Sequence, residues 1–307
     1  MLYDILIIGA GPAGYTASIY ASRYGLKNIV IGATLGGYAA ENHKVCNYPS
    51  EKEISGKDLM QKFYDHAASY GAPIVNEEVV AIKKDAENFI AKTMSGTEYM
   101  GRAMILAIGT KPRKLNVVGE DRLLGRGISY CFTCDGFFFK NKVVAVIGSG
   151  NSGHTASIYL SRIAKKVYQI VRGNELKGEI ELIDEVKNNP NIELIFNTNI
   201  KEAIGEQKLE KIKLAKEVSG SMEVVVDGLF IEIGTKPVIG VFKDFKLRKN
   251  RDGFIKVNAD QSTNVSGVWA AGDITTGSNG LRQIVTACSE GAVAATSVSR
   301  HLKNNNL

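Results

Sequence analysis

The feature that most constrains the fold of this 307-residue chain is an apolar strand that runs into a glycine-rich turn and then a helix. The strand spans residues 3–8, the turn at 9–14 is Gly-Ala-Gly-Pro-Ala-Gly, and apolar residues recur at helical spacing over 16–24. Another strand follows at 28–31. In this setting Gly-x-Gly-x-x-Gly allows a tight turn and brings the N–H groups of a helix start to a pyrophosphate. The sequence therefore predicts a dinucleotide site at this turn.

The same order of elements occurs a second time. A strand spans residues 142–147, the turn at 148–153 is Gly-Ser-Gly-Asn-Ser-Gly, a helix follows over 154–163, and the next strand spans 166–171. A second dinucleotide site is expected here for the same reason.

Each copy also ends alike, because an apolar strand followed by Gly-Thr-Lys-Pro occurs at 103–112 and again at 228–237. The chain is longer than one hydrophobic core usually organises, which favours two domains of similar plan. The remaining tail is too short for a third domain and is expected to complete the first. We expect an α/β fold of two Rossmann-like, three-layer domains, with residues 1–113 and 243–307 forming a discontinuous first domain and 114–242 the second.

Local patterns predict several further elements. They are a helix at 58–70 capped by Ser55, an antiparallel layer from segments 74–82, 89–93 and 98–106, short strands at 253–257 and 267–270, and a closing helix at 281–302.

Composition excludes several classes of function. The 38 basic and 32 acidic residues leave a net charge of +6 and form no long run, so no nucleic-acid partner is expected. No apolar stretch approaches the ~18 residues that span a bilayer, and no signal peptide is expected at the start. Four cysteines are too few for a disulfide scaffold. We expect a cytoplasmic protein with one catalytic cysteine pair.

That pair lies in Cys131-Phe132-Thr133-Cys134-Asp135-Gly136, just before the second glycine turn. Two cysteines separated by two residues can close a small disulfide or share a metal, and an adjacent acid can move a proton when the disulfide opens. The chain therefore has the features of a redox enzyme. Aromatic residues surround the pair, and Phe132 is the one we expect to be exposed to a partner protein.

A zinc site is the alternative for these cysteines. His43 and Cys46 stand three residues apart and could join Cys131 and Cys134 as ligands. The two pairs come from different segments and no second Cys-x-x-Cys exists, so we expect no metal. Cys46 and Cys288 are expected to be inert, buried or half-buried thiols.

Across essentially its whole length the chain resembles the low-molecular-weight, FAD-dependent thioredoxin reductases. The matching segments are residues 9–14, Gly36-Gly37, Asn47-Tyr48-Pro49, 127–136, 148–153, 263–273 and Arg282-Gln283.

The resemblance implies two cofactor sites. For FAD it implies Gly9, Gly11, Pro12, Ala13, Gly14, Gly36, Gly37, Asn47, Gly109, Gly272, Asp273, Arg282 and Gln283. For the pyridine nucleotide it implies Gly148, Gly150, Asn151, Ser152, Gly153, Arg172 and Lys177.

The resemblance also implies a mechanism. Cys134 faces the flavin, Cys131 attacks the disulfide of a thioredoxin-like or glutaredoxin-like protein, and Asp135 serves as general acid and base. A homodimer is implied as well. The dithiol and the second glycine turn share one domain and would compete for one place at the flavin, which a domain rotation would resolve.

The nucleotide site departs from the family at the end of its second strand. Family members that use NADPH have His-Arg-Arg there and a further arginine four residues on, whereas this chain has Val171-Arg172-Gly173 and Lys177. Lysine cannot reproduce the planar grip of arginine on a 2′-phosphate. We rank NADPH first, with NADH, a deazaflavin, a ferredoxin or no donor as alternatives.

Three other residues depart from the pattern or could have two roles. Thr34 stands where an acid would bind the FAD ribose. Tyr38 replaces a glutamine and could stack near the flavin or fill space. His154 could face the nucleotide, although a histidine on the helix surface is favoured.

Three functions are compatible with these residues. The first is a thioredoxin-disulfide reductase. The second is a flavin-dependent oxidase of small dithiols, which stays an alternative because the residues for the 2′-phosphate of NADPH are weakened. The third is a non-catalytic sensor of nucleotide or redox state that retains the folds.

Overall fold

The structure is a computed structural model that describes residues 1–307 apart from 43–44, 86, 219, 238–241, 243–244 and 305–307. The chain forms two compact units. The first is discontinuous and consists of Met1–Lys111 and Lys236–Leu307, and the second is Pro112–Thr235. These units differ by a few residues from the boundaries expected from sequence.

A seven-stranded sheet forms the centre of the first unit, in the order β3-β2-β1-β6-β5-β4, with β17 also paired to β6. Its strands are β1 (Leu2–Ile8), β2 (Asn28–Ile31), β3 (Ile74–Val75), β4 (Val79–Asp85), β5 (Asn88–Thr93), β6 (Glu98–Leu106) and β17 (Val268–Ala270). The pairs among β3, β2, β1, β6 and β17 are parallel, and β4, β5 and β6 pair antiparallel as expected.

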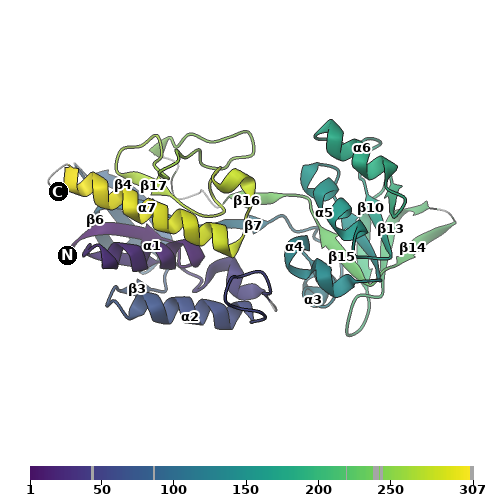
Figure 1. Cartoon of the computed structure of the whole chain (residues 1–307), viewed down its shortest axis with the longest axis horizontal. Helices are drawn as coiled ribbons and strands as arrows, with labels where there is room; N and C mark the ends of the chain where they lie inside the picture. The colour runs from purple at the N-terminus through teal and green to yellow at the C-terminus, as the bar shows by residue number, and fades with distance from the viewer. Residues whose placement is uncertain (43–44, 86, 219, 238–241, 243–244, 305–307) are drawn as a thin grey trace. The chain divides into compact units, whose positions relative to one another are not determined.

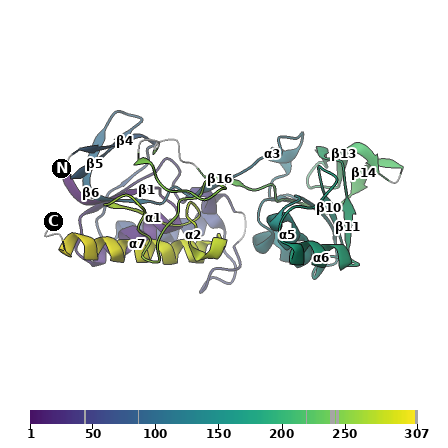
Figure 2. The ribbon, with the colours of Figure 1, turned by 90° about the horizontal axis from the view of Figure 1, so that it is seen from above.

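Three helices lie along one face of this sheet (Figures 1 and 2). They are α1 (Pro12–Arg23), α2 (Gly56–Ala68) and α7 (Ile284–Asn304), and short 3₁₀ helices occur at η1 (Gly37–Glu41) and η4 (Ser278–Gly280). Ile5 and Ile7 pack with α1 and α7 in one core cluster, whereas Leu6 and Ile8 belong to another. This split follows from the two-residue period of a strand, which sends neighbouring side chains to opposite faces.

The predicted cap of α2 is confirmed, since the Ser55 hydroxyl accepts the N–H of Asp58 at 3.0 Å. The predicted strand at 253–257 is wrong, because only Ile255 forms bridges there. The Asn250 side-chain oxygen accepts the N–H groups of Asp252 and Phe254, and this local turn takes the place of a strand.

The second unit repeats the plan with a parallel sheet in the order β11-β10-β9-β15-β8. Its strands are β8 (Ile128–Ser129), β9 (Val143–Ile147), β10 (Lys166–Ile170), β11 (Ile192–Ile195) and β15 (Gly228–Ile231). An antiparallel sheet of β12 (Ile200–Ile204), β13 (Lys211–Val218) and β14 (Ser221–Val225) is added to it. Its helices are α3 (Glu120–Leu123), α4 (Phe132–Asp135), η2 (Gly136–Phe139), α5 (Asn151–Ser161) and α6 (Ile180–Asn188).

Alternation along β9 again builds two layers of core. Val144 and Val146 pack with Leu160 of α5, and Ala145 and Ile147 pack with side chains of the antiparallel sheet. Figure 2 shows α5 and α6 together on one side of this unit. The predicted fold class, two Rossmann-like domains of which the first is discontinuous, is confirmed.

The two Gly-Thr-Lys-Pro segments form the connection between the units. Strands β7 (Thr110–Pro112) and β16 (Thr235–Pro237) pair with each other as a two-stranded sheet. No helix of the part that the structure describes is long and apolar enough to span a membrane.

Candidate active site

The first glycine turn is packed too closely for side chains. A Cβ on Gly14 would lie 1.9 Å from the carbonyl oxygen of Gly9, and a Cβ on Gly9 would lie 2.2 Å from that of Ala107. Helix α1 begins at Pro12 with no side-chain cap on its N–H groups. Uncapped N–H groups at a helix start suit a phosphate group.

A second glycine segment lies against this turn. The N–H of Gly36 donates to the carbonyl of Ala10 at 2.7 Å, and a Cβ on Gly37 would lie 3.3 Å from Cα of Gly11. Tyr38 follows in η1 and is 37% exposed, so it does not fill the core. The two glycine segments together leave a narrow cradle free of side chains.

Asp273 follows strand β17 at the carboxyl end of the sheet. Burial raises its pKa to about 6, while the Arg282 guanidinium lowers it and the Glu290 carboxylate raises it further. The Arg282 guanidinium lies 3.9 Å from the centre of the Phe254 ring, and its Nε donates to the carbonyl of Asp273. The side chain of Asn47 donates to that of Gln283 at 2.9 Å.

Glu290 supports this loop and was missed by the sequence analysis. Its buried carboxylate accepts the N–H of Gly272 at 2.8 Å, the hydroxyl of Thr275 at 2.8 Å and that of Ser278 at 2.6 Å. A glutamate on a long helix gives no sequence signal of this role, because the residues it binds lie 12 to 18 positions away.

The residues of the first unit fit a dinucleotide. The glycine cradle admits a backbone-bound pyrophosphate, and Asp273 and Arg282 offer a carboxylate and a guanidinium at the neighbouring strand end. Gly109, also expected at this site, takes a positive φ of 61°. Thr34, which stands where an acid would bind the FAD ribose, is exposed. The usual acidic contact to the ribose is therefore missing at this position.

In the second unit Cys131 and Cys134 form a disulfide with their Cα atoms 5.3 Å apart. Cys131 caps α4, and its sulfur accepts the N–H of Cys134 at 3.3 Å and lies 3.4 Å from the Thr133 hydroxyl. Its own N–H donates to the hydroxyl of Ser129 at 2.9 Å. Asp135 ends the same helix, so the cysteines and the acid lie within one turn.

The prediction that Phe132 is the exposed aromatic residue is wrong. Its ring packs on Tyr159 of α5 with centroids 5.5 Å apart, because α4 lies against that helix. Phe137 and Phe138 are the exposed side chains of the group, at 68% and 36%.

The second glycine turn repeats the close packing of the first. A Cβ on Gly153 would lie 2.6 Å from the carbonyl oxygen of Gly148. Helix α5 begins at Asn151 without a side-chain cap on its N–H groups. The Asn151 side chain instead exchanges two hydrogen bonds of 2.9 Å with Glu179, which orients the start of the helix.

His154 lies inside this unit, which contradicts the expectation of a helix-surface histidine. It is fully buried, its Nε2 lies 3.0 Å from the carbonyl of Lys177, and its Nδ1 lies 2.9 Å from the Gln169 amide. Gln169 also donates to the carbonyl of Gly148. The histidine therefore ties the glycine turn to the segment that carries Lys177.

The segment after strand β10 is open to solvent. Val171 is buried, whereas Arg172, Gly173 and Lys177 are exposed. No heavy atom lies within 4 Å of a Cβ built on Gly173. One arginine and one lysine are thus available to a phosphate at this strand end.

No cluster of three or more His, Cys, Asp and Glu side chains suited to a metal occurs among the described residues. His43, which belongs to the zinc alternative, lies outside them. Cys46 is exposed, so the expectation of a buried thiol is wrong for it, because its segment runs along the surface. Cys288 is half-buried as expected, and burial raises the pKa of its thiol.

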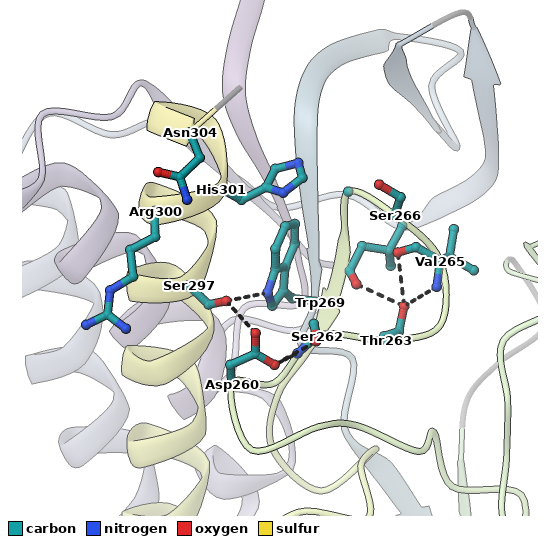
Figure 3. A pocket seen from close by; sticks show the side chains of 12 residues that line it. Asp260, Ser262, Thr263, Val265, Ser266, Trp269, Ser297, Arg300, His301 and Asn304 are labelled. Carbon is teal, nitrogen blue, oxygen red and sulfur yellow. Dashed lines mark hydrogen bonds between the residues drawn. The ribbon is translucent and has the colours of Figure 1, made fainter. Parts of the chain in front are cut away.

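A cavity of about 340 Å³ in the first unit contains none of these residues. Figure 3 shows that it lies at the end of α7 and is lined by Asp260, Trp269, Ser297, Arg300 and His301, among others. The Trp269 indole donates to Ser297, and Ser297 donates to Asp260. These polar groups bind one another.

Comparison with known proteins agrees with this geometry. The sequence profile of a family described as pyridine nucleotide-disulphide oxidoreductase matches residues 3–291. A thioredoxin reductase of Bacillus subtilis is 38% identical over 305 residues, which cover 98% of this chain and 95% of that protein. One of Peptoclostridium acidaminophilum is 36% identical, with 99% and 98% covered.

Solved structures give the same result. The crystal structure of thioredoxin reductase from Streptococcus pyogenes has a TM-score of 0.91 at 33% identity and covers 99% of both chains. Thioredoxin reductase from Giardia duodenalis has a TM-score of 0.92 at 31% identity and covers 98% of this chain and 99% of that one. The chain therefore belongs to the pyridine nucleotide-disulphide oxidoreductases, and among them to the family of low-molecular-weight thioredoxin reductases.

Proposed function

We propose that the chain is an FAD-dependent thioredoxin-disulfide reductase that passes electrons from NAD(P)H to a thioredoxin-like protein. The observation that carries this proposal is the Cys131–Cys134 disulfide at the start of α4, in the unit that also holds the second glycine turn. A redox-active pair beside a dinucleotide turn serves electron transfer, and the relatives in both comparisons are named thioredoxin reductases.

The first unit holds FAD. The N–H groups at the start of α1 and the cradle of residues 9–14 with Gly36 and Gly37 bind its pyrophosphate. Asp273, Arg282 and Gln283 lie at the neighbouring strand end and would hold the remainder of the cofactor. Bound FAD supplies two-electron transfer, which protein side chains cannot perform.

Three residues of the second unit handle the sulfur chemistry. Cys131 is the attacking sulfur, because the N–H of Cys134 and the Thr133 hydroxyl can stabilise its thiolate. Cys134 resolves the mixed disulfide with the partner, and it would be the sulfur that receives electrons once FAD is bound. Asp135, at the end of the same short helix, delivers and accepts the proton.

The second glycine turn holds the electron donor, for which we rank NADPH ahead of NADH. Arg172 and Lys177 are exposed and can reach a 2′-phosphate, although without the bidentate grip that two arginines give. This weaker binding of the 2′-phosphate supports a preference for NADPH over NADH that is less strict than in the family.

The acceptor is a thioredoxin-like or glutaredoxin-like protein, and exposed Phe137 beside the dithiol offers it an apolar contact. We further propose a homodimer that works in the cytoplasm, where reducing conditions keep the dithiol in turnover.

An anaerobic titration of the purified flavoprotein tests donor and acceptor together. Flavin absorbance is followed by stopped flow during addition of NADPH or NADH, and new thiols are counted after a thioredoxin is added. We expect bleaching by NADPH and two new thiols per thioredoxin. If neither NADPH nor NADH bleaches the flavin, the assignment of NAD(P)H as donor is wrong. Oxygen consumption with a small dithiol alone would favour an oxidase.

A further inference from the structure

One buried polar pair in the second unit has no part in the function proposed above. His154 of α5 and Gln169 of β10 are both fully buried, and the Gln169 amide nitrogen lies 2.9 Å from Nδ1 of His154. Val167, two residues before Gln169 and on the same face of β10, packs in the apolar core against α5. The pair therefore places two polar side chains in a layer that is otherwise apolar.

The first unit shows that the frame does not need this pair. Tyr15 directly follows the last glycine of its turn, as His154 does, and Val30 stands one residue before the end of β2, as Gln169 does in β10. Both counterparts are fully buried. The amide oxygen of Gln169 has no hydrogen-bond partner among the described residues, and an unpaired buried acceptor costs stability. Stability of the fold alone therefore does not account for the pair.

The hydrogen bonds of the pair form one directed chain. The carbonyls of Gly148 and Lys177 can only accept, so the Gln169 amide gives one hydrogen to Gly148 at 2.8 Å and the other to Nδ1 of His154. The proton of the imidazole then stands on Nε2, which donates to the carbonyl of Lys177 at 3.0 Å. The chain thus runs from the first glycine of the turn to the peptide of Lys177.

Two further hydrogen bonds fasten the same stretch to the turn and to the start of α5. The N–H of Lys177 donates to the carbonyl of Ser149 at 2.7 Å, and the N–H of Glu179 donates to the Asn151 side chain at 2.9 Å. A Cβ on Gly178, which lies between them, would be 2.0 Å from that side-chain oxygen. The backbone at 177–179 is therefore packed directly on the nucleotide turn.

The stretch that these bonds hold carries the two cations of the donor site. Residues 172–179 contain no helix or strand, and Arg172 and Lys177 are exposed. In the part of the chain that the structure describes, no ion pair engages either of them. Exposed irregular backbone opens readily unless such bonds hold it. The end of β10 is also where this frame places the ribose of a dinucleotide.

We propose that His154, oriented by Gln169, is a specificity-determining positioning residue that fixes the Lys177 peptide on the second glycine turn so that the ammonium group meets the 2′-phosphate of NADPH. The inference rests on the proposed function, which makes this turn the donor site. A lysine lacks the planar fork of arginine, and ordering its side chain on binding costs affinity. Fixing the peptide from inside the domain lowers that cost.

The test measures equilibrium binding of NADP⁺ and NAD⁺ to the oxidised flavoprotein by isothermal titration calorimetry. His154→Leu keeps an apolar side chain in the core but cannot donate to Lys177. It should weaken NADP⁺ binding about tenfold, the equivalent of leaving one long side chain to be ordered by the ligand. Binding of NAD⁺, which lacks the 2′-phosphate, should change less than about twofold. His154→Gln, whose amide can donate to the same carbonyl, should recover most of the loss.

A double-mutant cycle shows whether the effect acts through Lys177. In a Lys177→Gln background, His154→Leu should change NADP⁺ affinity less than about twofold, because no ammonium group remains to be placed. Without nucleotide, His154→Leu should speed hydrogen exchange of the 172–179 peptide about tenfold. Ser157→Ala is the matched control, since it removes a fully buried hydroxyl of the same helix that has no partner among the described residues. It should follow the wild type in both measurements.

Gln169→Val introduces the side chain of Val30 and gives a second route, should His154→Leu not fold. It should weaken NADP⁺ binding about threefold, because the imidazole loses the bond that orients it. An equal loss for NAD⁺, unchanged hydrogen exchange, or additive effects of His154 and Lys177 would overturn the proposal. A wild type that binds NAD⁺ but not NADP⁺ would also overturn it, yet would leave a reductase driven by NADH. Failure of thioredoxin reduction would not affect these binding measurements.

Discussion

The two glycine turns of this chain have the same backbone frame and different surroundings. In the first unit β1 lies between β2 and β6, and in the second β9 lies between β10 and β15. In both turns the last glycine lies close to the carbonyl of the first glycine. A Cβ on Gly14 would lie 1.9 Å from the Gly9 carbonyl oxygen, and one on Gly153 would lie 2.6 Å from that of Gly148. The frame is thus a repeated backbone arrangement, and it suits a pyrophosphate in both units.

What differs is the set of side chains at the carboxyl ends of the strands. The first unit places a half-buried acid there, Asp273, in a loop that Glu290 holds. The second unit instead carries a disulfide, Cys131–Cys134, at the start of α4, just before the strand that leads into its turn. On the proposed function, a duplicated frame sets where each dinucleotide binds, while the residues at its edge decide what chemistry occurs there.

The largest expected effect comes from removing the attacking sulfur in the second unit. Cys131→Ser should lower thioredoxin reduction about 10³-fold or more, because no thiolate remains to attack the partner disulfide, while the donor still bleaches the flavin. Insulin reduction through thioredoxin and stopped-flow absorbance measure the two steps. Cys46→Ser, which changes an exposed thiol, is the matched control and should retain full activity. Full turnover of the Cys131 variant would refute its role.

Each frame can be broken on its own by one methyl group. Gly14→Ala should lose most bound flavin, since its Cβ would clash with the Gly9 carbonyl. Gly153→Ala should keep its flavin but lose about 10- to 100-fold in the rate of donor-driven bleaching, because helix α5 must shift away from Gly148. The flavin-to-protein ratio and the bleaching rate report these losses.

Gly173→Ala serves as control for both variants, as its Cβ meets no atom within 4 Å. Equal flavin loss in the Gly14 and Gly153 variants would contradict the assignment of separate cofactors to the two turns.

A gain of function sharpens the same comparison at the donor site. Gly173→Arg adds a guanidinium beside Arg172 in a space that is open, so the KM for NADPH should fall about tenfold while that for NADH stays unchanged. Steady-state kinetics with both nucleotides measure the change, and Gly173→Ala should leave both values as they are. An equal fall for NADH would show that the arginine does not bind the 2′-phosphate.

The sequence was sufficient for the frame because its signals are local. Glycines at fixed spacing after an apolar strand define each turn, and the two cysteines lie within one turn of helix. Ser55 was also predictable, since an N-cap binds an N–H group three residues away.

The sequence was insufficient where a residue acts through distant neighbours. His154 is buried because Gln169 and the Lys177 segment enclose it, and nothing in its own helix indicates this. Glu290 resembles an ordinary acidic residue until the fold brings it to Gly272. The exposure of Phe132 was mispredicted for the same reason, because Tyr159, on which its ring packs, is distant in the sequence.

The smallest expected effect concerns the acid of the first unit. The pKa of Asp273 is about 6 in the folded chain and 3.8 ordinarily, so the folded state holds the proton more tightly than the unfolded state. Stability should therefore fall as pH rises from about 4 to 6 and level off above, by on the order of 2 kcal/mol. Asp273→Asn cannot ionise, so its stability should exceed that of the wild type by an amount that grows over this range. Urea unfolding of flavin-free protein at each pH measures the difference, and one that stays constant from pH 4 to 7 would show that Asp273 is not held neutral by burial.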